Sequence, residues 1–438
     1  MIIHKYKIFF AVILIFICSN LYSQAVRFIN ETEAISLAIS NNSELVNARY
    51  EKLKAEKKVN QVYMENLIPS FSLSTQYIRA FKKQVIDIFG QRFEIGTDNT
   101  IYNVFNLQQT IPFLGAPVFS GVNIAEFYSK LQDENIISTT SKVKTDVKKS
   151  FYNVLFLKEV LEVNKQALKN AEDNLRLVEA KYKNGVVLEF DYLRAKVTVE
   201  SLKPNVSQSE SNLLISKKLL KNNIGIKTNE EIDVTGNLKY DSLEVFGETE
   251  KIITKIADSS VSIRQLSISQ KINRELVTID KSNYLPKLFI FGQYSLNAAE
   301  NDGRGLFDFR YYKIVNAGIG LVWDFNIFKT GYKTEQSEID VKKTNELILD
   351  VKQKLKIQAK NILLRMEDAK KRIVSQYETV KLAEKGYDLA NRGYKDGVLN
   401  QIDVLDAELR FNQTKLAYLQ AIYDYLTAKA ELEGLLEL

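Results

Sequence analysis

Two aspartates, Asp403 and Asp406, are the residues whose types and spacing best suit chemistry in this 438-residue chain. Residues three positions apart share a face of a helix, so the two carboxyl groups could act as a pair. Such a pair can attract and bind cations, or can transfer protons as the paired carboxylates of glycosidases do. The surrounding sequence predicts a coiled coil and no cleft lined with aromatic residues, so we expect no enzymatic activity and no catalytic residue.

Composition limits the other chemistry that the chain could perform. Its only histidine and only cysteine, His4 and Cys18, lie in the first 23 residues. There, two lysines precede an apolar run that is too short to span a bilayer, which is typical of a cleaved secretory signal, 1–23. The bulky Ile17 disfavours lipid attachment at Cys18. The mature chain then lacks an imidazole base, a thiol and any His or Cys metal ligand, and we predict no metal and no cofactor.

Charge and hydropathy restrict the classes of partner. Removing the signal also removes two lysines and lowers the formal net charge from +6 to +4. A surface of interspersed Lys and Glu on an exported protein gives no reason to expect a nucleic acid partner. No mature segment has 18 continuous apolar residues, so no transmembrane helix is predicted.

The aspartates belong to a stretch that occurs twice. Residues 182–195 and 394–407 align without a gap at a constant offset of 212 and share Tyr, Lys, Gly, Val, Asp, Leu and Ala. This internal repeat indicates a tandem duplication. The glycine in each copy is predicted to end a long helix in the left-handed conformation, so that a second helix returns after a tight turn.

Apolar residues on both sides of these turns are spaced by three and four, which predicts coiled-coil helices with the same phase in both halves. In the first half they are Val154, Leu157, Leu161, Leu168, Ala171, Leu175, Val178 and Tyr182. In the second half they are Met366, Ala369, Ile373, Val380, Ala383, Tyr387, Ala390 and Tyr394, followed after the turn by Ile402, Leu405, Leu409, Leu416, Leu419, Tyr423, Leu426 and Ala430.

The period changes from helical to alternating after Pro69 and again after Pro286. Each half is therefore predicted to contain two strands with one apolar face, joined by a polar loop. Strands of about 10 residues that alternate in polarity and carry aromatic residues near their ends are typical of tilted strands in an outer membrane. The four predicted strands are 70–80, 101–111, 287–296 and 314–325, and the loops are about 80–100 and 297–313.

Each half thus has the order helix, strand, strand, helix, tip turn, helix. We predict a first repeat at 24–234, a linker at 235–250 and a second repeat at 251–438. Four strands cannot close a barrel, and an open edge in hydrocarbon costs several kcal/mol per unpaired backbone group. Several chains must therefore combine their strands, and three chains supply twelve. The predicted fold class is a mixed α+β membrane protein with tandem-duplicated coiled-coil helices and four transmembrane β-strands per chain.

The repeated pattern Tyr-x-x-Gly-x-x-x-x-x-Asp-x-Leu-x-Ala and the order Pro, strand, loop, strand together resemble the TolC family of outer-membrane efflux proteins over essentially all of 24–438. This resemblance implies a homotrimer with a 12-stranded β-barrel in the outer membrane of a Gram-negative bacterium and a periplasmic α-helical barrel. It also implies export of small molecules or proteins in a tripartite efflux or type I secretion system. The implied partners are a periplasmic adaptor (membrane fusion) protein, an inner-membrane pump and outer-membrane lipid. The alternative is a secreted structural or adhesion coiled-coil protein, which would not need the four alternating strands.

The resemblance also implies roles for individual residues. Family carboxylates at the positions of Asp403 and Asp406 face the pore at its constriction, where a trimer gathers six charges. Capping of a helix start remains an equal alternative for Asp403 and its counterpart Asp191, whereas Asp406 lies deeper in the helix. The resemblance implies that Tyr394 holds the closed tip by a hydrogen bond that Asp191 could accept. Leu399 stands where the best-known members carry an arginine of the closing network.

The tip turns are also where adaptors dock in the family. The exposed pairs Gly185–Val186 and Gly397–Val398 are therefore the predicted adaptor contacts.

Overall fold

The computed structural model describes residues 26–111, 117–226, 230–240, 248–305 and 308–438. The predicted signal at 1–23, with His4 and Cys18, lies outside these residues. The chain forms two compact units, and the helices α3, α4 and α8 contribute residues to both. Unit 1 comprises Met1–Asn47, Ile137–Ser260 and Gln353–Leu438, and unit 2 comprises Ala48–Ile136 and Val261–Lys352.

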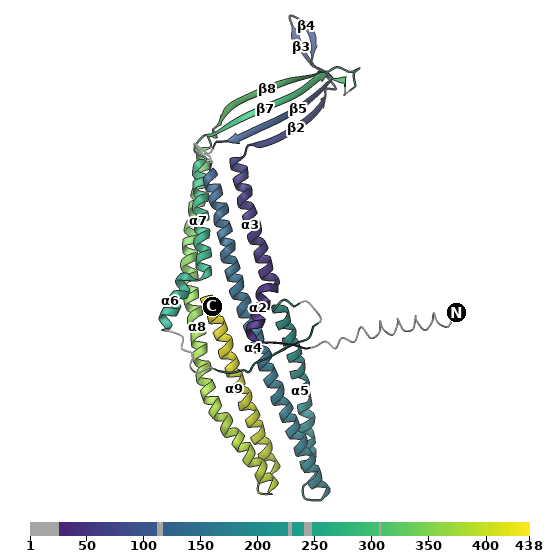
Figure 1. Ribbon diagram of the computed structural model, residues 1–438, viewed down its shortest axis with the longest axis vertical. Coiled ribbons are helices and arrows are strands. Elements are labelled where there is room, and N and C mark those ends of the chain that lie inside the picture. The colour runs from purple at the N-terminus through teal and green to yellow at the C-terminus, as the bar shows by residue number, and fades with distance from the viewer. Residues whose placement is uncertain (1–25, 112–116, 227–229, 241–247, 306–307) are drawn as a thin grey trace, which may run out of the picture. The chain divides into compact units, whose positions relative to one another are not determined.

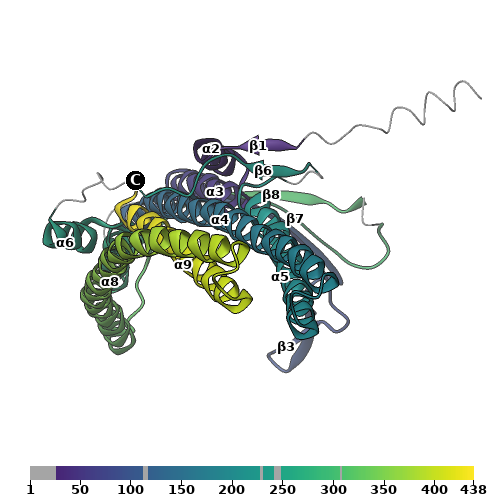
Figure 2. The same cartoon turned by 90° about the horizontal axis from the view of Figure 1, so that it is seen from below.

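Two antiparallel helical hairpins form most of unit 1 (Figure 1). In the first hairpin α4 (Val118–Lys183) is followed by α5 (Glu189–Asn223), and in the second α8 (Ile327–Lys395) is followed by α9 (Gln401–Leu436). The two hairpins lie side by side in both views, and their turns lie at the same end (Figures 1 and 2). Most of the heptad positions predicted upstream of the turns are buried, with Val154, Val178 and Ala369 fully so.

The rest of unit 1 comprises two short helices and a pair of short strands. Helices α2 (Glu31–Asn41) and α6 (Thr249–Ser259) occupy equivalent places in the two repeats, and α6 overlaps the end of the predicted linker. The part of that linker at 241–247 lies outside the described residues. Strand β1 (Arg27–Ile29) pairs in parallel with β6 (Ile232–Val234), a pairing that the sequence patterns did not predict.

Unit 2 contains the sheet and the helices that lead into it. The helices α3 (Ser43–Leu67) and α7 (Val261–Ser282) begin directly after the breaks at Asn42 and Ser260. The sheet has the antiparallel order β2-β5-β7-β8, and its strands are β2 (Ser70–Arg79), β5 (Asn99–Thr110), β7 (Lys287–Glu300) and β8 (Tyr311–Val322). Strands from the two repeats meet at its centre, because β5 pairs with β7 from Asn99↔Glu300 to Thr110↔Phe289.

The loops between the strands are more ordered than predicted. A β-hairpin formed by β3 (Gln84–Ile88) and β4 (Gln91–Ile95) lies within the predicted loop 80–100. In the second repeat the predicted loop 297–313 is shorter, because β7 continues to Glu300 beside β5 and β8 already begins at Tyr311. These strands were missed because each added segment is only a few residues long and lies in a stretch rich in charged residues and glycine, so its periodic signal is weak.

Among the described residues, no helix is both long and apolar enough to cross a membrane.

Candidate functional site at the hairpin turns

Both helical hairpins turn by the same backbone hydrogen bonds. At the end of α4, Gly185 N–H donates to the Tyr182 carbonyl at 2.9 Å and Val186 N–H donates to the Lys181 carbonyl at 2.9 Å. The second hairpin repeats this pattern, with Gly397 N–H donating to Tyr394 and Val398 N–H to Gly393. These pairs of bonds define a Schellman motif.

The motif requires a left-handed residue, and Gly185 and Gly397 have φ of 69° and 77°. The valines that follow have few contacts, since Val186 is 69% and Val398 is 80% exposed. Each turn therefore presents an apolar side chain to solvent at a fixed position.

Asp403 serves as a cap in this structure. Its Oδ2 accepts a hydrogen bond from the backbone N–H of Asn400 at 3.0 Å, at the third position of α9, as the acidic residue of a capping box does. Its counterpart Asp191 makes no such bond, and its Oδ1 lies 3.7 Å from Arg194 one turn further along α5. The capping interpretation thus holds for one of the two duplicated aspartates.

Asp406 points into solvent beside α9. Its Oδ2 accepts a hydrogen bond from Arg410 Nε at 2.9 Å, and both side chains are more than half exposed. No group of three or more His, Cys, Asp or Glu side chains that could hold a metal ion is found in the described part of the chain. Within one chain, Asp403 and Asp406 are therefore two separately paired carboxylates on one face of α9.

Tyr394 is buried, with 6% of its surface exposed, and its hydroxyl has no hydrogen-bond partner in the structure. Burial and the nearby charge of Asp191 raise the pKa of this hydroxyl, but the predicted bond between the two residues is not made within the chain. The Lys181 ammonium lies 4.1 Å from the centre of the Tyr394 ring and donates to the Tyr394 carbonyl at 3.4 Å. Lys181 thus joins the end of α4 to the end of α8 by a cation–π contact and a helix-terminal hydrogen bond.

Tyr394 belongs to a buried cluster that holds the two hairpins together, and we call this cluster the tip core. Its members come from all four hairpin helices: Val178, Ala195, Ala390, Tyr394 and Val404. The duplicated Tyr182 lies outside it, 38% exposed, and stacks on Tyr192 with ring centres 5.5 Å apart. The two copies of the repeated pattern therefore occupy different environments.

Comparison with known proteins gives the family. Residues 34–225 and 252–437 match the family described as outer membrane efflux protein. The chain belongs to the outer membrane efflux protein family. The predicted family is confirmed, and with it the predicted location in the outer membrane of a Gram-negative bacterium, with the helices extending into the periplasm.

Solved structures of outer membrane proteins share this fold. The outer membrane channel CmeC of Campylobacter jejuni is 17% identical with a TM-score of 0.74, over 92% of this chain and 85% of that one. VceC of Vibrio cholerae is 14% identical with a TM-score of 0.74, over 93% of this chain and 96% of that one. These matches confirm the predicted combination of coiled-coil helices with four strands per chain.

A relative found by sequence similarity matches a smaller part of this chain than the solved structures do. Nodulation protein T of Rhizobium leguminosarum bv. trifolii is 21% identical over 289 residues, or 64% of this chain. The chain spans 60% of the length of that relative.

In this outer membrane efflux protein the prediction was wrong about which face of α9 is buried next to the turn. Ile402 and Leu409 are more than half exposed, whereas Gln401 and Glu408 are 5% and 7% exposed. The buried stripe is displaced by one position because α9 begins at Gln401 and turns Val404 into the tip core. Apolar periodicity alone could not reveal this, since two of the three buried positions next to the turn are polar.

The two buried polar residues are the part of the site that sequence reasoning missed. Both side-chain polar atoms of Gln401 and the Oε1 of Glu408 lack hydrogen-bond partners in the structure, and an Asn170 side-chain hydrogen bond reaches Glu408 from α4. Burial raises the pKa of Glu408, and burial together with the Glu408 charge raises the pKa of Tyr387 to about 12. Their burial could have been predicted from spacing, since Tyr387, Tyr394, Gln401 and Glu408 follow one another at intervals of seven.

Leu399 also has a clear position. It lies over Gly393, where a Cβ would come within 2.8 Å of the leucine side chain, and its N–H donates to the Gly393 carbonyl at 3.1 Å. An apolar contact therefore occupies the place expected to hold an arginine in the best-known members.

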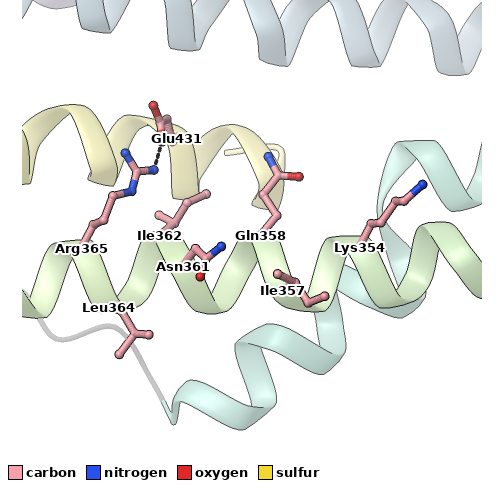
Figure 3. Close-up of a pocket in the computed structure, with 8 residues that line it drawn as sticks. All are labelled: Lys354, Ile357, Gln358, Asn361, Ile362, Leu364, Arg365 and Glu431. Carbon is pink, nitrogen blue, oxygen red and sulfur yellow. Dashed lines mark hydrogen bonds and ion pairs between the residues drawn. The ribbon is translucent and has the colours of Figure 1, made fainter.

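A groove of about 670 Å³ lies away from the turns, along α8 and against α9 (Figure 3). Arg365 crosses from α8 to pair with Glu431 of α9, while Leu364 points to the other side of α8 (Figure 3). Ile357 and Leu364 are each about half exposed. This groove is an apolar surface with a charged border, and its residues have no arrangement suited to catalysis.

Proposed function

We propose that this outer membrane efflux protein is the outer-membrane duct of a tripartite efflux or type I secretion system. It would export small molecules or proteins across the periplasm and the outer membrane as a homotrimer, with a periplasmic adaptor and an inner-membrane pump as partners. The observation that supports this most strongly is the sheet of unit 2, which has one apolar face and two unpaired edges.

The register of the sheet places large apolar side chains from all four strands on one face. Examples are the cross-strand neighbours Leu73↔Phe105, Phe105↔Tyr294 and Tyr294↔Val315. We call this surface the sheet apolar face, and its members are Phe71, Leu73, Tyr77, Ile101, Phe105, Leu107, Leu288, Ile290, Tyr294, Leu296, Val315, Ile319 and Leu321. Ile319 and Val315 are more than 70% exposed, which suits contact with outer-membrane lipid.

The opposite face has the character of a channel lining. On β2 it carries Ser70, Ser72, Ser74 and Gln76, all exposed. Two of its large apolar members, Phe289 and Phe291, are covered, because their rings lie over Gly320 and Gly318 of β8. A Cβ at Gly318 would come within 3.0 Å of the Phe291 ring, so these glycines are needed for the rings to lie flat against the sheet. Other apolar side chains on this face include Ile78, Val104, Ile314 and Val322.

The two edge strands support the trimer. Strands β2 and β8 each pair on one side only. In hydrocarbon their remaining N–H and C=O groups would cost several kcal/mol each, so a lipid-facing sheet of this kind needs neighbours at both edges. Three copies joined β8 to β2 would give the closed set of twelve strands. A secreted adhesion or structural coiled coil would gain nothing from such an exposed apolar sheet.

We assign the hairpin turns to gating and docking. Asp403 and Asp406 share a face of α9 and would ring the constriction in a trimer, while Tyr394 and Asp191 lie where the two hairpins meet. The adaptor would contact Gly185, Val186, Gly397 and Val398, because each turn presents an exposed valine at a fixed place.

Native mass measurement of the mature protein in detergent tests the assembly, and we expect a trimer. A stable monomer would remove the argument from the sheet edges. For docking, Val186→Asp with Val398→Asp should lower export in cells and leave the trimer yield unchanged, because neither side chain is packed. Loss of the trimer in this double variant would instead assign the valines to assembly.

A further inference from the structure

The hairpin β3–β4, between β2 and β5, has two chemically different faces. The pairs Ile86↔Phe93 and Gln84↔Ile95 lie on one side, and Asp87↔Arg92 and Val85↔Glu94 lie on the other. Ile86, Ile88, Phe93 and Ile95 therefore form a continuous uncharged surface, which we call the hairpin apolar face. All four side chains are between 36% and 48% exposed, so no described residue covers this surface.

The end and the base of this hairpin are well defined. Phe89 and Gly90 form its turn with φ of 53° and 77°, the two left-handed residues of a type I′ turn, and the Phe89 side chain is fully exposed. At the base, Arg79 pairs with Asp302 at 3.0 Å, and Lys83 pairs with Asp98 at 3.0 Å.

The base also joins the two repeats. The Asp302 N–H donates to Asp98 Oδ2 at 2.9 Å, and Lys83 donates to the Asn301 side chain at 2.9 Å. The hairpin therefore starts from a fixed polar base, and among the described strands β3 and β4 pair only with each other.

A hairpin of two five-residue strands is marginally stable in water without a further layer of packing. Packing of the hairpin apolar face against a surface outside the single chain would supply such a layer. Membrane hydrocarbon is a poor candidate, because the charged base separates this face from the sheet apolar face. Tyr77 is the last large member of the sheet apolar face on β2, and the extended chain from there to Gln84 can span roughly 20 Å past Arg79 and Lys83.

A second copy of the same hairpin fits better. The hairpin apolar face carries no charge, so identical faces can meet around a symmetry axis without repulsion. The hairpin also follows directly from β2, the edge strand that the proposed trimer pairs with a neighbouring chain. In one trimer the three hairpins would be held at an effective concentration on the order of millimolar, which favours contacts too weak to form between free chains.

We propose that the hairpin apolar faces of the three protomers pack against one another and form an apolar cap over the outer mouth of the channel. The proposal rests on the trimeric duct proposed above. Asp87, Arg92 and Glu94 keep the other face of each hairpin in water, so the cap is one layer thick and can separate without unfolding the sheet.

Single cysteines test this arrangement, because the mature sequence contains no cysteine of its own. Ile86→Cys lies on the hairpin apolar face, and its neighbour Val85→Cys lies on the opposite face as a matched control. Treatment of trimers with a short bismaleimide should join chains through Ile86→Cys several times more often than through Val85→Cys. Simple accessibility predicts the reverse, since Val85 is 48% and Ile86 is 36% exposed. Equal cross-linking, or more at Val85→Cys, would overturn the cap.

Two further measurements separate the possible causes of failure. Native mass measurement on the same variants reports the trimer, so a trimer without selective cross-linking refutes only the cap, whereas monomers refute the duct. A bimane label on Ile88→Cys should be insensitive to lipids that carry a quencher in their tails, and strong quenching would assign the face to the membrane and overturn the proposal. In planar bilayers, Ile86→Asn with Phe93→Asn should raise the conductance above that of Val85→Asn, and an equal conductance would count against a closed mouth.

Discussion

Replacing Glu408 by Gln should stabilise the helical hairpins at neutral pH and reduce their response to pH. Glu408 is 7% exposed, its Oε1 has no hydrogen-bond partner in the structure, and a side-chain hydrogen bond reaches it from Asn170. Burial removes the water that would stabilise the charge and raises the pKa of this carboxyl above 4.5. Gln keeps the size of the side chain and removes the charge.

The sign and magnitude follow from these contacts. A raised pKa means that the folded protein holds a proton at pH values where the unfolded chain has lost it. The stabilisation is therefore complete below the ordinary pKa of 4.5 and is lost as the pH rises through the raised value. A buried polar group without a partner costs about 1–3 kcal/mol, so we expect Glu408→Gln to gain about 1 kcal/mol near pH 8. For a unit of this size that corresponds to an unfolding temperature higher by roughly 2–4 °C.

Thermal unfolding followed by circular dichroism near pH 4 and pH 8 measures both quantities. The matched control is Asp406→Asn, which changes an exposed carboxylate paired with Arg410 at 2.9 Å and should alter stability by about 0.5 kcal/mol or less. Glu408→Gln should lose its advantage near pH 4, where the wild-type carboxyl is protonated. The reasoning is refuted if Glu408→Gln is less stable than wild type near pH 8 and retains the same pH dependence, because the carboxylate would then have a stabilising partner.

Three further comparisons test other parts of unit 1. Asp406→Ala should weaken the cation preference of reconstituted channels with little change in stability. Asp403→Ala should weaken it too and should also lower the free energy of unfolding by about 1 kcal/mol, because the helix cap is lost. Unchanged reversal potentials in both variants would refute the gate assignment. Gly225→Ala should destabilise more than Gly185→Ala in thermal unfolding. Both need the left-handed conformation, which costs about 1–2 kcal/mol, but only at Gly225 would the new Cβ lie 2.5 Å from a backbone carbonyl. Tyr394→Phe should leave the unfolding temperature unchanged or slightly higher, and a loss above about 1 kcal/mol would mean that the hydroxyl is bonded in the assembly.

The sequence was sufficient for features that depend on local backbone geometry or on a clear period. Gly185 and Gly397 could be predicted to end their helices because only a left-handed residue completes the Schellman motif. The change of period after Pro69 likewise predicted β2, which begins at Ser70. The family followed from the duplicated turn and the strands together, since neither feature alone is specific.

Features that depend on tertiary neighbours could not be predicted in the same way. The buried positions of Gln401 and Glu408 depend on which face of α9 meets α4, and these polar residues do not continue the expected apolar heptad. The pairing of β1 with β6 joins two three-residue segments that are about 200 residues apart, too short to produce any periodic signal. Asp403 could be interpreted as a cap or as a pore residue because both roles need a carboxylate at the start of a helix.

The pairing of β1 with β6 has a consequence for how a duplicated chain of this kind could arise. Arg27 lies near the start of the predicted first repeat, 24–234, and Val234 is its last residue. The parallel register places these two ends within the same three-residue ladder. A second copy of the gene segment, inserted after Val234, would begin close in space to the point where the first copy began. The second hairpin can then run in the same direction as the first without a long connection, as the shared end of their turns in Figure 1 shows. Head-to-tail duplication of such a unit is therefore compatible with an unchanged path of the first copy.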